Sequence, residues 1–380
     1  MKTGTSLAWS RPAEQWWPDH HHAPDCDVLI VGSGYGGSFA AKTLARPGRR
    51  VWLVERGREY PLGSFPDSIG TLPGHVRLQK GADSHGTGNA DGLLDFRQYA
   101  DVAVLVGNGL GGGSLINAGV AVLPEADLFQ HPHWPAHYRQ HTEHRDALWQ
   151  AMQEVQTVLQ ARPFAHAAEL RKYQALAVLG QSVGEQAEAV PITVASEDQV
   201  STAGVAQAAC TRCGNCFTGC NVGAKNTTLT HVLPDAVRAG AELITGLTVL
   251  DIRPCEGTDA QADDGGPPYR WRVRMAMTAD LSSTGERQVM EVRARTVVLS
   301  AGALGSTEIL QRSRALKLSP LLGQRFSTNG DVLALGWGMG ARVNGMARSD
   351  EAEQPPAERV GPTITGRLAP SLPVAGQQRR

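Results

Sequence analysis

The sequence predicts an α/β fold, and three stretches of residues support this prediction. "DVLIVGSGYGGSFAAKTLA", from Asp27, is typical of an apolar strand, a glycine turn and a helix rich in small residues. "RVWLVERG" supplies a second apolar strand that ends at Glu55 and completes a βαβ unit of about thirty residues. Farther along, "RTVVLSAGALGS" again runs from a strand into a glycine turn before a helix. Strands that alternate with helices in this way predict an α/β domain.

The composition is that of a soluble globular protein and argues against several classes of partner. The chain has 380 residues, of which 41% are hydrophobic and 19% charged, and its formal net charge is −1 at pH 7. Acids and bases are interspersed, so no long-range field favours nucleic acid or anionic lipid. No apolar run is long enough for a signal-peptide core or a membrane span. We therefore expect a cytoplasmic protein that binds no nucleic acid.

The remaining elements follow in order along the chain. Residues 58–100 carry turn signals throughout and predict no regular structure. The stretch "DVAVLVGNGL" is a strand that opens into glycines, and the apolar spacing within 134–161 and 170–179 predicts two helices. A helix bent at Pro234 and stopped at Gly240 then precedes a series of strands that forms a β-meander.

This order of elements predicts the domain organisation. We expect one discontinuous α/β domain, interrupted by a helical insertion and flanked by tails that cannot bury enough apolar surface to fold alone. Its parts are a disordered tail at 1–25, the α/β domain at 26–125 and 205–338, the insertion at 126–204, and a low-complexity or truncated tail at 339–380.

Gly32, Gly34 and Gly37 form the pattern G-x-G-x-x-G between the first strand and its helix. The first glycine allows a tight turn, the second lets a pyrophosphate approach the backbone, and the third lets the helix pack closely on the strand. The N-terminus of the following helix favours phosphate. Glu55, at the end of the next strand, is placed to accept hydrogen bonds from a ribose. These residues predict a Rossmann-like site for FAD or NAD and argue against a 2′-phosphate.

A second glycine stretch, "GNGLGGGSLINAG" from Gly107, does not lead into an evident helix but continues to Ser114 and Asn117. Backbone that must lie flat against a large planar cofactor needs residues without side chains. A flavin ring meets that description better than a nicotinamide. The alternative that these residues leave open is a flexible glycine loop.

Taken together, the motifs resemble a known family. "DVLIVGSGYGGSFAAKTLA", "LVERG", "VGNGLGGGSLINAGV", "VVLSAGALGSTEILQRS" and "LGQRFSTNGDVLALGWG" are similar, in order, to the glucose-methanol-choline (GMC) oxidoreductases, and specifically to the bacterial cholesterol-oxidase-like branch. The resemblance extends from about Asp27 to about Thr365 and includes the cysteine-rich stretch described below. It implies FAD, hydride transfer from an alcohol carbon to the flavin, a sterol or similarly bulky apolar substrate, and oxygen or a redox carrier as electron acceptor.

The resemblance also implies roles for individual residues. Gly32, Gly34 and Gly37 would hold the pyrophosphate and Glu55 the ribose, and Val249 would reach the adenine through its backbone. On the flavin side the resemblance implies Gly111, Gly112, Ser114, Asn117 and Gly119. It places Gly302 near the cofactor, and Asn329, Gly330 and Asp331 close to the ring.

The chain departs from the family at its catalytic residues. Members of the family carry a late His and an Asn, or a second His, that take the alcohol proton and orient the substrate. Nothing here resembles those segments, and the last histidine of the sequence is His231. We expect a C-terminally incomplete member that lacks most of the substrate domain, with unknown catalytic residues and turnover near background. The alternatives are a non-catalytic FAD-binding remnant and an electron-transfer protein that combines flavin with an iron–sulfur cluster.

Four cysteines, Cys210, Cys213, Cys216 and Cys220, follow the spacing C-x2-C-x2-C-x3-C. This spacing holds iron–sulfur clusters in bacterial ferredoxins, although Asn221 stands where a proline is usual. Four thiolates suit a [4Fe–4S] cluster and also structural zinc. Three alternatives therefore stay open: a [4Fe–4S] cluster, a zinc ion, and thiols without metal.

Two groups of histidines also invite a metal site. Three are adjacent at 20–22, and five more at 131–144 include His137 and His141, an i, i+4 pair. No third ligand of an evident kind accompanies either group. We expect a solvated tail and a solvated helix face.

Overall fold

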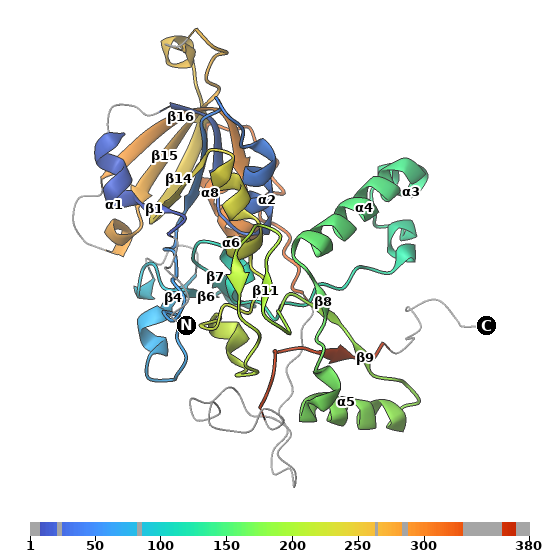
Figure 1. The fold of residues 1–380 in the computed structure, drawn as a ribbon. Helices are drawn as coiled ribbons and strands as arrows, with labels where there is room; N and C mark the ends of the chain where they lie inside the picture. Colours follow the sequence, from blue (N-terminus) through green and yellow to red (C-terminus); the bar gives the residue numbers. More distant parts are fainter. Residues whose placement is uncertain are drawn as a thin grey trace.

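The computed structural model describes residues 8–20, 25–81, 86–262, 265–282, 288–329 and 359–369. A seven-stranded sheet dominates the described fold (Figure 1). Its first five strands are parallel to their neighbours, and the pairings among the last three are antiparallel, which gives a meander. In spatial order the strands are β1 (Arg11–Pro12), β13 (Ala241–Thr245), β3 (Val51–Glu55), β2 (Asp25–Val31), β16 (Val289–Leu299), β15 (Trp271–Met277) and β14 (Leu247–Pro254).

Residues 28–31 of β2 and 51–54 of β3 are all apolar because both faces of the sheet are covered there. Successive side chains alternate between two apolar layers, with Leu29 and Trp52 in one and Ile30 and Leu53 in the other. The α/β fold that the sequence predicts, with its βαβ unit, is thereby confirmed. The helices on the first layer are α1 (Ala13–Trp16) and α8 (Gly302–Arg312), and those on the second are α2 (Tyr35–Leu44) and α7 (Leu233–Arg238).

Residues 8–20 are folded, where the sequence predicted a disordered tail. β1 pairs in parallel with β13, and Trp16 in α1 is completely buried in the first apolar layer. Its ring meets the Trp52 ring edge to face, with centroids 5.0 Å apart. The prediction was wrong because the apolar area of Trp16 and Trp17 outweighs the polar composition around them. Residues 1–7 and 21–24 lie outside the described part of the chain.

We expect Trp16→Ala to lower the free energy of unfolding by about 3–5 kcal/mol, because it removes a large side chain from a closed apolar layer. Leu62→Ala is the control, since Leu62 is 61% exposed. Chemical denaturation followed by tryptophan fluorescence or circular dichroism measures both. Equal stability of Trp16→Ala and the unaltered protein would show that residues 8–20 do not belong to the folded core.

A second, four-stranded sheet lies below the first in Figure 1, and three of its strands fall within residues 58–100, for which the sequence predicted no regular structure. That prediction was wrong for residues 76–80, 87–88 and 94–98. The fourth strand, at residues 103–107, lies in the stretch from Asp101 that was predicted as a strand. β4 and β6 are parallel, and the other neighbours are antiparallel. The strands in spatial order are β5 (Thr87–Gly88), β4 (Val76–Lys80), β6 (Leu94–Gln98) and β7 (Ala103–Gly107).

The second sheet exposes apolar side chains on one face and buries charged side chains on the other. Leu78, Phe96 and Leu105 are cross-strand neighbours on one face, and all three are exposed. The opposite face carries Asp95 and Arg97, which are buried. Half-buried strands usually alternate buried apolar residues with exposed polar ones, and here the buried residues are charged. Hydrophobic periodicity therefore did not reveal these strands.

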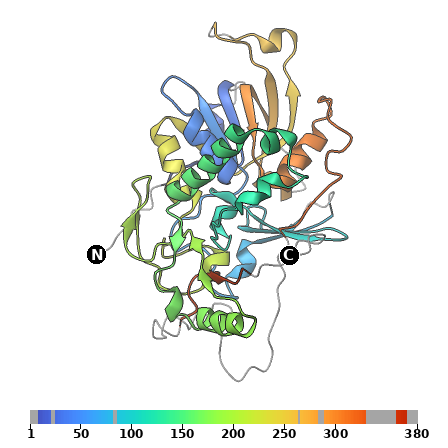
Figure 2. The ribbon, with the colours of Figure 1, turned by 90° about the vertical axis from the view of Figure 1, so that its right-hand side faces the viewer.

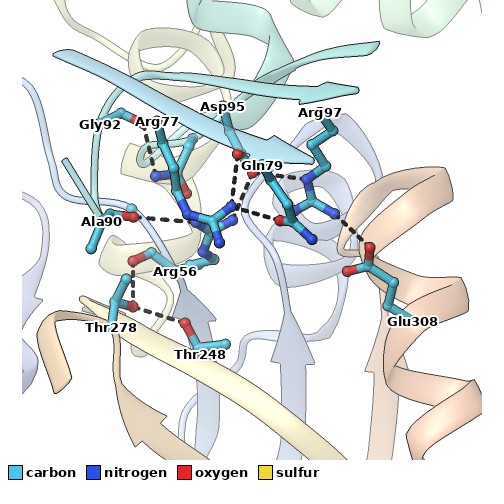
Figure 3. A network of polar contacts seen from close by, with 12 residues as sticks. Arg56, Arg77, Gln79, Ala90, Gly92, Asp95, Arg97, Thr248, Thr278 and Glu308 are labelled. Atoms are coloured by element: carbon cyan, nitrogen blue, oxygen red, sulfur yellow. Dashed lines mark hydrogen bonds and ion pairs between the residues drawn. The ribbon is translucent and has the colours of Figure 1, made fainter. Parts of the chain in front are cut away.

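The buried charges form one network (Figure 3). The Asp95 carboxylate accepts from Arg56 and Arg77 at 2.8 Å and from Arg97 at 2.9 Å. Arg97 also donates to Glu308 on α8 at 2.9 Å. Burial alone would raise the pKa of Asp95, but the three guanidinium groups hold it below its usual range. The network therefore ties the second sheet to the end of β3 and to α8.

The expected helical insertion contains α3 (Ala136–Gln140), α4 (Thr142–Val158) and α5 (Arg171–Ser182). Figure 2, in which this side faces the viewer, shows α4 in front of the seven-stranded sheet. The α6 (Thr228–His231) and α7 helices break at Val232, just before Pro234, close to the predicted bend. The remaining short strands are β8 (Arg162–Pro163), β9 (Glu188–Ala189), β10 (Pro191–Ile192), β11 (Gln199–Val200), β12 (Ala206–Gln207) and β17 (Gly366–Arg367).

Part of the expected C-terminal tail is folded. β17 pairs with β9 of the insertion, and Thr365 is 3% exposed. Residues 330–358 and 370–380 lie outside the described part of the chain, so the rest of that prediction is untested. None of the described helices combines the length and apolarity that crossing a membrane requires.

Candidate cofactor site

The phosphate-binding turn has the geometry that its glycines predict. Gly32 has φ +93°, and Gly34 caps the N-terminus of α2. A Cβ on Gly37 would lie 1.8 Å from the Gly32 carbonyl oxygen, so helix and strand can approach only without that side chain. A Cβ on Gly34 would meet no atom within 4 Å, so this face of the turn is open. The open N-terminus of α2 is suited to a phosphate group.

Glu55 is buried, and its carboxylate accepts hydrogen bonds from Ser33 in the phosphate turn. One carboxylate oxygen accepts from the Ser33 amide at 3.0 Å and hydroxyl at 2.5 Å, and the other accepts from the Gly57 amide at 2.9 Å. Burial raises the pKa of Glu55, and these hydrogen bonds oppose the rise. The hydroxyl oxygen of Ser33 in turn accepts a hydrogen bond from the Gly111 amide at 2.9 Å. Glu55 therefore has a structural task that the sequence did not indicate, and its ribose contact stays a prediction.

The second glycine stretch packs directly on the first. Gly111 and Gly112 have φ +111° and +55°, and a Cβ on Gly112 would lie 2.7 Å from the Gly34 Cα. Ser114 accepts from the Thr228 amide at 3.2 Å, at the start of α6. The stretch is thus a tightly packed loop in the described structure, which argues against the alternative of a flexible one.

In the side-chain amide of Asn117, the nitrogen has a hydrogen-bond partner and the oxygen has none among the described residues. Its Nδ2 donates to the Tyr35 hydroxyl at 2.8 Å, whereas its Oδ1 is buried with no hydrogen-bond partner among the described residues. A buried acceptor without a donor costs about 1–3 kcal/mol. Two residues on, Gly119 has φ +75° and accepts from the Thr193 amide at 2.7 Å. The Asn117 oxygen is therefore a candidate acceptor for an N–H group of a ligand.

Lys225 joins this loop to the cysteine-rich stretch. It is 3% exposed, and its ammonium group donates to the carbonyls of Leu115 at 3.0 Å, Asn117 at 2.6 Å and Cys216 at 3.0 Å. Burial lowers the pKa of Lys225 to about 8. No sequence pattern indicated this residue, because its contacts with Leu115 and Asn117 join segments more than a hundred residues apart.

A cavity of about 810 Å³ opens beside the loop. Asn117, Gly119 and Asn329 line it, so the structure brings together three residues that the resemblance placed near the flavin. Gly330 and Asp331 lie outside the described residues. The lining residues that the sequence did not single out are mainly apolar and include Val104, Leu105, Val120, Phe217, Phe326 and Ile364, with Arg367.

The two other predicted contacts, Gly302 and Val249, belong to α8 and to β14. Gly302 is the first residue of α8 and has φ +75°. Ser300, two residues earlier, packs closely on the phosphate turn, since a Cβ on Gly32 would lie 2.5 Å from the Ser300 carbonyl oxygen. Val249 is buried in β14, and its carbonyl accepts from the Arg312 side chain at 3.3 Å. Gly302 therefore lies near the phosphate turn, while its place near the cofactor and the adenine contact of Val249 stay predictions.

The four clustered cysteines are half-buried free thiols, and burial raises the pKa of Cys210 and Cys213. Tetrahedral zinc would bring its thiolate sulfurs to about 3.8 Å from one another. No three of these thiols lie that close, since the only group of three metal-ligating atoms within 4.8 Å in the described part of the chain is elsewhere. The geometry therefore does not favour zinc, and the iron–sulfur and metal-free alternatives remain.

Comparison with known proteins now decides the family. The family model described as GMC oxidoreductase matches residues 26–329. This chain belongs to the GMC oxidoreductase family. The resemblance drawn from the motifs is confirmed.

Several curated relatives of this GMC chain are named as oxidases of cholesterol or of long-chain alcohols. A cholesterol oxidase of Mycobacterium tuberculosis is 31% identical over 327 residues, which are 82% of this chain and 52% of that protein. A cholesterol oxidase of Acinetobacter baumannii is 27% identical, over 81% of this chain and 55% of the relative. A long-chain-alcohol oxidase of Arabidopsis thaliana is 27% identical, over 78% of this chain and 36% of that protein. The chain thus spans about half the length of the cholesterol oxidases it matches.

We expect Gly112→Ala to displace the second glycine loop, because its Cβ would collide with the Gly34 Cα at a backbone angle that favours glycine. The expected loss of stability is about 1–3 kcal/mol. Gly113→Ala is the matched control, since a Cβ there meets no atom within 4 Å. Thermal unfolding of both variants checks this, and an equal melting temperature for the two would contradict the packing described here.

Proposed function

We propose that this chain binds FAD and supports the oxidation of an alcohol CH–OH group, with a sterol or a similarly bulky apolar alcohol as substrate. Its membership of the GMC oxidoreductase family and its similarity to cholesterol oxidases support the reaction class. The observation that carries the proposal is the junction of the phosphate turn, the second glycine loop and the cavity around Asn117.

The residues present fit FAD. The open N-terminus of α2 at Gly34 offers amide groups to the pyrophosphate, and Gly113, where a Cβ would meet no atom within 4 Å, leaves backbone free to lie against a planar ring. The buried Asn117 Oδ1 needs a donor, and the flavin ring carries an N–H group. When bound, the flavin supplies the hydride acceptor, and the protein supplies orientation and electrostatics.

The mainly apolar lining of the cavity supports an apolar substrate. Its volume, about 810 Å³, lies in the range of about 300–1,000 Å³ that is usual for small-molecule sites. Alcohol oxidation also needs a base to accept the hydroxyl proton. Of the described residues that line the cavity, only Arg367 is ionisable, and a guanidinium is not a base at neutral pH. This supports slow turnover by the residues described here; the electron acceptor and the cytoplasmic location stay predictions.

We expect the purified protein to show a flavin absorption spectrum or to acquire one on addition of FAD. Asn117→Leu should weaken FAD binding about tenfold, because it removes a hydrogen bond of about 1.5 kcal/mol. Tyr35→Phe is the control, since it removes only the partner of Asn117 Nδ2 and leaves the Oδ1 acceptor in place. Flavin fluorescence titration measures both. Protein that neither contains nor binds FAD would refute the proposed function.

The cysteine-rich stretch yields a separate prediction. After anaerobic purification, iron and sulfide analysis should find either about four irons per chain or none. If a cluster is present, Cys213→Ser should abolish it and leave FAD bound, which would favour an electron-transfer role. Loss of both together would instead assign the stretch a structural role, consistent with the contact of Lys225 with both Cys216 and the glycine loop.

A further inference from the structure

The α3 and α4 helices, at the right of Figure 1, meet at a corner where three metal-ligating side chains lie close together. His141 lies between the two helices, and Glu143 and His144 are in the first turn of α4. Glu143 Oε1 is 3.3 Å from His141 Nδ1 and 3.9 Å from His144 Nε2. The three ligand atoms all lie within 4.8 Å of one another.

The sequence pattern missed this group because it supplied no third ligand to the histidines. Glu143 is two residues from His141 and adjacent to His144, so its carboxylate reaches both only where one helix ends and the next begins. Its own amide group, and then the two imidazoles, hold the pKa of Glu143 below its usual range. The solvated helix face expected at this position therefore also carries a preformed triad.

The spacing of the triad is close to that of a metal site. Two ligand atoms on a tetrahedral zinc ion, each about 2.0–2.1 Å from it, are about 3.4 Å apart. The distances of 3.3 and 3.9 Å from Glu143 Oε1 therefore require only small side-chain rotations. The His137 ring stacks on the His144 ring, with centroids 3.8 Å apart, and so supports the orientation of that ligand.

We propose that His141, Glu143 and His144 form a binding site for a divalent late transition metal, Zn²⁺ or Cu²⁺, with water in the remaining coordination position. Two imidazoles and one carboxylate suit these ions, whereas Mg²⁺ and Ca²⁺ require mainly oxygen ligands. The side chains are 41–68% exposed, which leaves an open path for the ion. The site is independent of the proposed flavin chemistry.

Zinc titration of untagged, chelator-treated protein in a calorimeter tests this proposal. The unaltered protein should bind one more equivalent of Zn²⁺ than the double variant His141→Ala/His144→Ala, or bind it at least tenfold more tightly. The matched control is His131→Ala/His133→Ala, which removes two histidines of the same segment that lie outside the triad. Thermal unfolding without metal should be the same for all three proteins, because the two mutated triad side chains are 52% and 41% exposed.

The clustered cysteines could also bind zinc, and X-ray absorption at the zinc edge separates the two sites. The equivalent that the double variant loses should show only nitrogen and oxygen neighbours at about 2.0–2.2 Å, whereas a thiolate site would show sulfur at about 2.3 Å. An unchanged zinc stoichiometry and affinity in His141→Ala/His144→Ala would overturn the proposal. The same loss in the control, or an all-sulfur environment for the lost equivalent, would also overturn it.

Discussion

The hydroxyl group of Ser33 joins the three segments on which the candidate site depends. It donates to the buried carboxylate of Glu55 at the end of β3 and accepts from the Gly111 amide of the second glycine loop. Without it, a buried carboxylate and a buried amide would each lose a partner. The phosphate turn, the strand end and the loop are therefore positioned together, with Gly112 packed on Gly34.

The second sheet extends this arrangement. Its strand β7 leads directly into the glycine loop, so whatever fixes the sheet also fixes the start of the loop. The fixing element is the carboxylate of Asp95, which is completely buried and paired with Arg56, Arg77 and Arg97. Removing Asp95 would take away the carboxylate that three guanidinium groups share, which is far more costly than removing a surface ion pair. Charge burial thus replaces an apolar interface on the inner face of this sheet.

The sequence predicted the parts of the site whose signals are local. Gly32, Gly34 and Gly37 lie within six residues between a strand and a helix, and the structure places them as predicted. The meeting of Asn117 with Asn329 at the cavity was expected from the resemblance and not from any pattern in the residues.

What the sequence missed depends on contacts between distant segments. Lys225 reaches Leu115 and Asn117 across more than a hundred residues, and Trp16 is buried against strands that come later in the chain. Strands β4 and β6 were missed for another reason, since their buried face is charged. A polarity pattern cannot reveal such contacts, because each depends on a partner that only folding brings near.

The affinity of Ser33→Ala for FAD tests the central claim most directly. The variant keeps the G-x-G-x-x-G glycines and removes only the hydroxyl that joins Glu55 to Gly111. Flavin fluorescence titration should show binding at least tenfold weaker than in the unaltered protein, as expected for the loss of hydrogen bonds of about 1.5 kcal/mol or more. Ser64→Ala, at an exposed turn, should bind as the unaltered protein does. Unchanged FAD affinity in Ser33→Ala would contradict the account.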